Sequence, residues 1–227
     1  MMTSDFILPS STLMPSMGPV LRGSVRIWNY RKRKITRTID LFSPDGSPAQ
    51  GTMDVKMLPK DPHGYGYTAG MFDGHIYLID PDSDIGSVAF DLATVKPHVD
   101  APVPGGMGQI MATPKSGDRP SVGTFMAGQV VMLDTTDRFN LQQVSVVSFG
   151  ANAGPHNIVL SDDGIRLVVT DYFLNEDQKG IIHFEGDHKV HVLKVTHNTL
   201  TEDKRFNLDF NTAFKTGPAR PHGIAMK

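Results

Sequence analysis

The sequence predicts an all-β protein, built as a partial β-propeller of about three to four blades. Helical periodicity is scarce, whereas short runs rich in Val, Ile, Thr, Tyr and Phe recur between clusters of Gly, Pro, Asp and Asn. Four similar strands start at residues 25, 75, 129 and 189, so they repeat after 50, 54 and 60 residues. Such a repeat is typical of propeller blades, because one small sheet buries its faces only against neighbouring sheets. A β-sandwich is the alternative architecture.

The expected strands share β-branched and aromatic residues, and turn signals such as the FDG at 72–74 separate them. In chain order they are 24–30, 35–41, 64–71, 75–80, 87–92, 108–113, 121–126, 129–135, 141–149, 157–161, 166–173, 189–195, 205–210 and 222–226. They group into blade units at 1–60, 61–104, 105–153 and 154–219, and the inner strand of a further blade follows at 220–227.

This number of blades is smaller than a closed propeller usually needs. The sequence therefore predicts a fragment of a longer protein, a chain that pairs with another copy, or an open array. Open propeller edges are candidates for self-association, because an unpaired edge strand is a template for another chain.

The composition excludes several functional classes. The 22 basic and 24 acidic residues give a net charge of -2, so no long-range field favours nucleic acid, and the basic run at 31–34 is expected to be a solvated turn. The absence of cysteine excludes disulfides, cysteine-ligated zinc and thiol nucleophiles within this chain. No apolar run approaches the roughly 18 residues needed to span a bilayer, so a cytoplasmic location is the default expectation.

His63, His156 and His222 each directly follow a proline and lead into an apolar stretch. Together with Met107 they are expected at the start of the innermost strand of successive units, 44, 49 and 66 residues apart. A preceding proline holds the chain extended and thus fixes where each imidazole points. Residues far apart in the sequence are therefore expected to meet at one end of the central channel.

Converging imidazoles are good ligands for Zn, Cu, Fe and Ni, and a thioether beside them favours copper. The hypothesis is a copper site of His63, His156 and His222, with Met107 as a possible fourth ligand. The alternative is that these histidines hydrogen-bond carbonyl groups around a water-filled channel and that Met107 packs in the core.

A second group of histidines lies in the segment IIHFEGDHKVH at 181–191, together with Glu185 and Asp187. His188 and His191 are an odd number of residues apart, so their side chains are expected on opposite faces of a strand. This segment is interpreted as a solvated or lid-like loop. No GxSxG, no P-loop and no GxGxxG between a strand and a helix occurs in the sequence.

Several stretches resemble the selenium-binding protein family, whose members include methanethiol oxidases. They are LRGSVRIWNYRKRKITRTIDL at 21–41, GPHNIVLSDDGIRLVVTDYF at 154–173, HFEGDHKVHVLKV at 183–195 and RFNLDFNTAFKTGPARPHGIAMK at 205–227. The resemblance implies a seven-bladed propeller of which this chain matches the C-terminal half, since family members are roughly twice as long.

The resemblance also implies an activity: copper-dependent oxidation of methanethiol with molecular oxygen to formaldehyde, hydrogen sulfide and hydrogen peroxide. Most copper-binding histidines of the family lie in the N-terminal half, which has no counterpart here, and His222 in GPARPHG is the position that matches. His63 and His156 rest on the repeat alone. The expected partners are a small thiol substrate or a selenium species.

Two other functional classes stay open. The first is a non-catalytic propeller module that binds selenium or a partner protein, with histidines that only shape the channel. The second is a lactonase-type hydrolase, which would need acidic ligands where this sequence has imidazoles. Fold alone does not decide between them.

Overall fold

The computed structural model describes residues 2–4, 23–151, 153–177 and 179–226, and it confirms the all-β class: apart from two short 3-10 turns, the described elements are strands. The strands are β1 (Met2–Ser4), β2 (Ser24–Asn29), β3 (Lys34–Leu41), β4 (Thr52–Met57), β5 (Gly66–Gly70), β6 (His75–Ile79), β7 (Ile85–Asp91), β8 (Gly108–Ala112), β9 (Ser121–Thr124), β10 (Gln129–Asp134), β11 (Gln142–Ser148), β12 (Pro155–Leu160), β13 (Arg166–Asp171), β14 (Asn175–Glu176), β15 (Ile182–His183), β16 (Lys189–Val195), β17 (Leu200–Glu202) and β18 (Leu208–Asp209). No helix long and apolar enough to cross a membrane occurs in this part of the chain.

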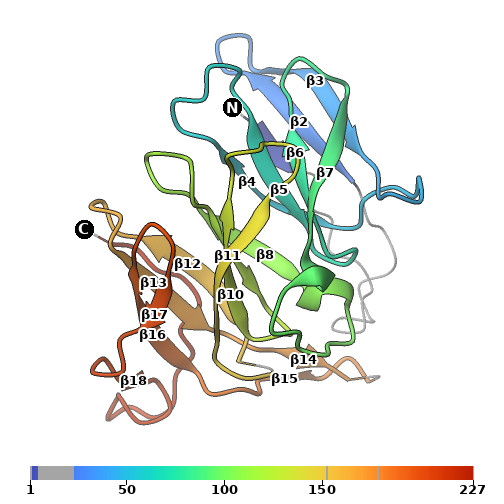
Figure 1. Cartoon of the computed structure of the whole chain (residues 1–227). Coiled ribbons are helices and arrows are strands. Elements are labelled where there is room, and N and C mark those ends of the chain that lie inside the picture. The colour runs from blue at the N-terminus through green and yellow to red at the C-terminus, as the bar shows by residue number, and fades with distance from the viewer. Residues whose placement is uncertain (1, 5–22, 152, 178, 227) are drawn as a thin grey trace.

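The strands form consecutive antiparallel sheets that follow one another in the order of the chain (Figure 1). The second sheet is β4-β5-β6-β7, the middle sheet is β8-β9-β10-β11, and the last sheet is β12-β13-β16-β17 with β18 beside β16. The first group, β1-β2-β3, joins the second sheet through a short parallel pairing of β3 with β7. A separate hairpin, β14-β15, lies between β13 and β16 in the chain. This order agrees with the up-and-down blades that the sequence predicts, and the number of blades in a complete ring stays a prediction.

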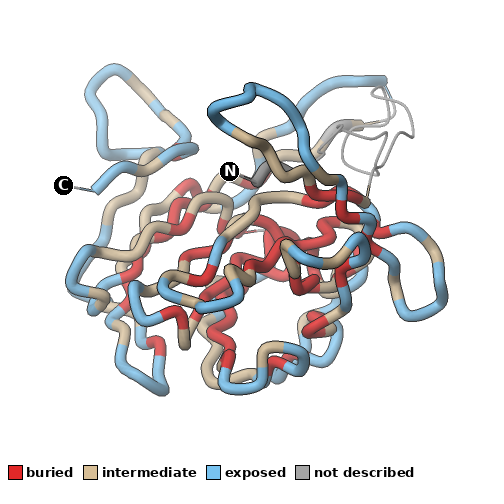
Figure 2. The backbone as a smooth tube through the Cα atoms, turned by 90° about the horizontal axis from the view of Figure 1, so that it is seen from above, coloured by how far each residue is buried: buried red, intermediate tan, exposed pale blue. Residues whose placement is uncertain are grey.

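The hydrophobic core lies between the sheets, and the middle sheet is buried on both faces. On β10, Val131 and Leu133 belong to the cluster shared with the second sheet, whereas Val130 and Met132 belong to the cluster shared with the last sheet. Alternate residues of a strand point to opposite faces, so an unbroken apolar run is needed here. Buried residues accordingly concentrate along the central strands, while the connecting loops are exposed (Figure 2). Burial of each large apolar side chain stabilises the folded state by about 1.5–3 kcal/mol relative to leaving it exposed to water.

The sequence prediction missed β4, and as a result it placed His63 at the start of the wrong strand. Asp54 and Lys56 interrupt the apolar pattern of β4 and form an ion pair of 3.1 Å. Asp54 lies in a bulge with φ +52, and its carboxylate accepts a hydrogen bond from the backbone N–H of Met111 in β8 at 3.0 Å. Because β4 is the first strand of its sheet, the placement of 64–71 as an innermost strand is wrong: β5 is the second strand.

The C-terminal prediction also needs correction. The expected strand at 222–226 does not form, and the expected strand at 205–210 is reduced to the two residues of β18. The tail is held by the carbonyl oxygen of His222, which accepts hydrogen bonds from Asn157 Nδ2 at 2.6 Å and Thr170 Oγ1 at 3.1 Å. The basic run at 31–34 lies in the exposed turn and adjoining strand end between β2 and β3, as expected.

Packing between the end of β11 and the β9-β10 turn gives a stability prediction. Gly128 in this turn has φ +64, and a Cβ atom there overlaps the carbonyl oxygen of Gly150. We expect Gly128→Ala to lower the free energy of unfolding by about 3 kcal/mol or more, measured by equilibrium urea denaturation. The matched control is Gly164→Ala, which has φ +75 but open space around the new Cβ and costs about 1 kcal/mol from backbone strain alone. Equal losses in the two variants would contradict this account of the packing.

Candidate functional site

His156 lies in a β-bulge at the start of β12. Pro155 and Asn157 pair with Asp171 and Thr170 of β13, so His156 is the extra residue that has no partner in the ladder. A bulge of this kind re-aims a side chain at the edge of a sheet. The bulge therefore explains how His156 and Asn157 reach the same neighbour, which is His222.

The structure brings His156 and His222 together although they lie 66 positions apart in the sequence. The two imidazole ring centroids are 4.5 Å apart with an interplanar angle of 35°. His222 is exposed, while His156 is partly buried. We call these two residues the histidine pair.

Aromatic rings surround the histidine pair. Tyr172, directly after β13, lies edge-on to both rings, with centroid distances of 4.5 Å to His222 and 5.7 Å to His156. Phe125 at the end of β9 contacts His156 from the middle sheet at 6.0 Å. Further out, the guanidinium of Arg220 lies 4.1 Å from the ring centroid of Phe184. The pair thus has an apolar wall on one side and solvent on the other.

The environment keeps His156 neutral at physiological pH. Burial, followed by the neighbouring charge of His222, lowers the pKa of His156 to about 4. Its Nδ1 lies 2.9 Å from Asn157 Nδ2, the same amide group that donates to the His222 carbonyl. Because that carbonyl can only accept, the amide nitrogen faces His156 and Nδ1 accepts its hydrogen bond. A neutral imidazole offers a nitrogen lone pair to a metal ion or a proton.

His63 and Met107 do not join the histidine pair. His63 is exposed in the turn between β4 and β5, where its ring stacks on Tyr65 at 5.2 Å. This turn follows the first strand of its sheet, whereas His156 lies at the start of such a strand. Met107 is fully buried in a core cluster that includes Phe125, so its packing agrees with the core interpretation. The expected meeting of all three histidines is therefore found for two of them.

Sequence reasoning missed a second polar cluster on the last sheet. Val169 of β13 pairs with His191 of β16, and Leu193 of β16 pairs with Glu202 of β17. Asp171 is two residues after Val169, and His191 is two residues before Leu193, so Asp171, His191 and Glu202 share one face of the sheet. His191 Nε2 lies 2.9 Å from Asp171 Oδ2, and His191 Nδ1 lies 2.8 Å from Glu202 Oε1.

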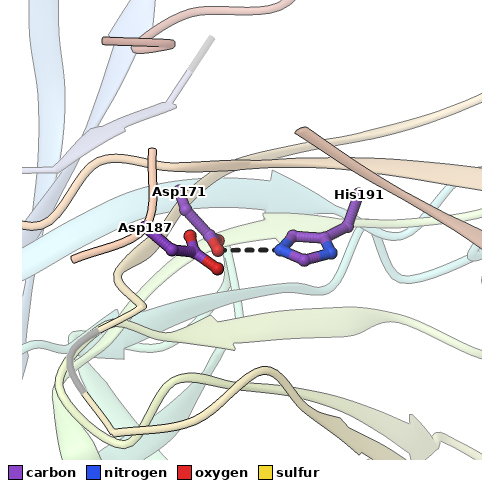
Figure 3. A group of neighbouring side chains, drawn as sticks. All are labelled: Asp171, Asp187 and His191. Carbon is purple, nitrogen blue, oxygen red and sulfur yellow. Dashed lines mark hydrogen bonds and ion pairs between the residues drawn. The ribbon is translucent and has the colours of Figure 1, made fainter. Parts of the chain in front are cut away.

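Asp187 completes this group from the segment before β16 (Figure 3). His188 lies just before β16 with φ +51 and contacts Asn211, so it is not in this group, and the argument from opposite faces of one strand does not apply to it. The interpretation of 181–191 as a solvated or lid-like loop holds for its first part, which is exposed, but not for the buried His188 and His191. The spacing of Asp187 and His191 gives no signal for this group, because β16 begins at Lys189 and His188 has a left-handed backbone with φ +51.

A groove of about 560 Å³ lies at the other end of β12, between the β8-β9 and β12-β13 turns. Its lining includes Arg119 and His197. Arg119 already forms an ion pair with Asp134 at 2.9 Å and contacts His197 Nε2 at 2.9 Å. Its positive charge is therefore compensated, and the groove lies away from both histidine clusters.

Comparison with known proteins shows a likeness in fold. No protein-family model matches the chain, and no curated protein matches it significantly in sequence. The chain is similar in structure to a hypothetical selenium-binding protein from Sulfolobus tokodaii, with a TM-score of 0.70 and 15% sequence identity over 98% of this chain and 54% of that chain. It is also similar to U3-55K, with a TM-score of 0.55 and 12% identity over 77% of this chain and 50% of that chain. A functionally unknown protein from Desulfotomaculum acetoxidans gives a TM-score of 0.52 and 16% identity over 80% of this chain and 48% of that chain. The chain thus spans about half the length of these structures.

The buried position of His156 predicts a pH effect on stability. The unfolded chain has a histidine pKa of about 6.5, above the folded value of about 4, so the unfolded state binds the proton more tightly. This contribution to stability is complete above pH 6.5 and is lost as the pH falls toward 4, by at most about 1.4 kcal/mol per pH unit. We expect His156→Gln to flatten this part of the stability curve, measured by urea denaturation between pH 4 and 7. An NMR titration of His156 with a midpoint near pH 6.5 would show that the ring is not buried as described.

Proposed function

We propose that this chain is the C-terminal half of a selenium-binding-protein-like propeller, and that its functional end is the histidine pair. The observation that carries the proposal is the 4.5 Å approach of His156 and His222. The sequence predicted both as ligands from different units of the repeat. The likeness to the hypothetical selenium-binding protein from Sulfolobus tokodaii supports the fold, with 54% of that chain covered.

Copper fits the chemistry of the histidine pair. Two imidazoles and no carboxylate suit a soft, singly charged ion better than a hard dication. The low pKa of His156 keeps its ring unprotonated at pH 7, so binding requires no proton release from this residue. His156 and His222 would hold the ion, and Tyr172 and Phe125 would limit the access of water to one side. His63 has no part in this site.

Methanethiol oxidation is the reaction that we assign to the complete protein. One molecule each of methanethiol, molecular oxygen and water gives one each of formaldehyde, hydrogen sulfide and hydrogen peroxide, so carbon is oxidised and oxygen is reduced. Bound copper would supply the one-electron steps between thiol and oxygen. The chain's own contribution would be to position the ion and to shield one side of the site with apolar rings.

A non-catalytic binding module is the second candidate. The observation in its favour is that the histidine pair offers two imidazoles and that no third His, Asp or Glu ligand joins them among the described residues. Such a module would bind copper, a small thiol or a selenium species without turnover.

Copper binding tests the histidine pair directly. We expect the protein to bind one Cu(I) in an anaerobic titration against a competing chelator, and His156→Ala or His222→Ala to weaken binding at least about 10-fold because each removes a ligand. His63→Ala is the matched control, since this exposed histidine lies in a different turn. Loss of binding in the control equal to that in His156→Ala would overturn the assignment.

Turnover separates the two candidate functions. Copper-loaded protein is mixed with methanethiol in air, and hydrogen peroxide and formaldehyde are measured. Equal release of both products that depends on His156 and His222 supports an oxidase. Stoichiometric copper without product supports the binding module.

A further inference from the structure

We propose that Asp171, Asp187 and His191 form a second metal site, which binds a divalent first-row transition metal ion such as Zn²⁺ or Mn²⁺ and is separate from the histidine pair. The three side chains come from the end of β13, the segment before β16, and β16 itself (Figure 3). They are the one group of three or more His, Asp or Glu ligands that the described part of the chain brings within reach of a single ion.

The spacing of the three side chains suits a metal ion. One ligand atom from each residue lies within 4.8 Å of the other two, and Asp171 Oδ2 is 2.9 Å from His191 Nε2. Two ligands at right angles on an ion with bonds of about 2.1 Å are about 3.0 Å apart. The hydrogen-bonded pair therefore already has the separation of two neighbouring ligands, and an ion would replace the proton between them.

An unpaired oxygen of the buried Asp171 is a second, independent indication that a cation binds here. Its side chain has 0% exposure, yet Oδ1 has no hydrogen-bond partner among the described residues. A buried carboxylate oxygen without a partner costs several kcal/mol. The neighbouring carboxylate of Asp187 is a second acceptor, so only a proton or a cation can stabilise the two together.

Glu202 and Phe149 orient His191 for such a role. Glu202 Oε1 lies 2.8 Å from His191 Nδ1, so this nitrogen donates and Nε2 is left to face Asp171. A carboxylate behind a histidine fixes the tautomer and raises the basicity of the ligating nitrogen, which is how metal-binding histidines are usually supported. The ring of Phe149 stacks on His191 at 3.9 Å and holds its plane.

Asp171 is the carboxylate of this cluster that has no lysine partner among the described residues. Lys189 pairs with Asp187 at 2.9 Å, and Lys204 pairs with Glu202 at 3.0 Å. The charged partner of the buried Asp171 carboxylate is His191, whose Nε2 lies 2.9 Å from Asp171 Oδ2. A divalent ion would compensate the Asp171 carboxylate, and Asp187, with 29% of its side chain exposed, leaves a path from solvent.

The donor set determines which ion fits. Two carboxylates and one imidazole are hard to intermediate donors, and no sulfur is among the three, so divalent ions are favoured over Cu(I). Three protein ligands also leave a coordination position for water or a substrate.

The test uses the His156→Ala/His222→Ala double variant as background, so that the histidine pair cannot contribute to binding. Metal-free protein is titrated with Zn²⁺ by calorimetry and with Co²⁺ by visible absorption, which reports the ligand field. We expect one ion per chain, at least about 100-fold weaker binding after Asp171→Asn, and about 10–100-fold weaker binding after Glu202→Gln. Asp177→Asn is the matched control, because Asp177 forms a similar 3.0 Å pair with His183 in an exposed hairpin.

Thermal melts keep the test valid if a variant is less stable. Saturating Zn²⁺ should raise the Tm of the background protein and leave that of Asp171→Asn unchanged, because only an ion that binds the folded state stabilises it. The proposal is overturned if the background protein binds no ion stoichiometrically, or if Asp177→Asn weakens binding as much as Asp171→Asn. Neither outcome depends on copper binding, so it leaves the proposed function untouched.

Discussion

Burial of both faces of the middle sheet is the constraint on which the rest of the structure depends. Alternate residues of β10 point into two different core clusters, so this sheet is stable only between the second sheet and the last one. The chain must therefore stack its sheets in sequence. Each of the two clusters described above includes a residue at a bulge or at the end of a strand. His156 is in the bulge that opens β12, and Asp171 is the last residue of β13.

The two clusters lie on opposite sides of the end of β13, because successive side chains of an extended chain point in opposite directions. Asp171 points toward His191, on the face that packs against the middle sheet, and the next residue, Tyr172, points toward the histidine pair on the other face. Thr170, with the same orientation as Tyr172, holds the carbonyl of His222. One face thus gives a carboxylate a buried environment, and the other gives an imidazole an aromatic one. The difference in chemistry follows from register and from what covers each face.

Most of the strands can be predicted from the sequence because the buried strands are apolar runs between strong turn signals. β10 was predicted nearly to its ends, whereas β4 was not, since Asp54 and Lys56 occupy an edge strand where the bulge and an ion pair accommodate them. The same error put His63 beside His156. The pair of His156 and His222 was found from a local pattern, proline followed by histidine, that recurs where the chain enters or covers a sheet. The group around His191 could not be found in this way, because it depends on the register of three strands, which turn signals alone do not determine.

The charge of an ion, in addition to its softness, determines whether it fits the histidine pair or the cluster around His191. An ion held by the two imidazoles, with no carboxylate beside it, keeps its whole charge next to Tyr172 and Phe125, so the cost of burying it grows steeply from a singly to a doubly charged ion. Around His191 the order is reversed, because Asp171 and Asp187 carry together the charge that a divalent ion neutralises. A singly charged ion there would leave a carboxylate uncompensated in the interior. The carboxylates around His191 and the histidine pair therefore discriminate between ions of different charge, even though Asp171 of one cluster and Tyr172 beside the other are consecutive residues at the end of β13.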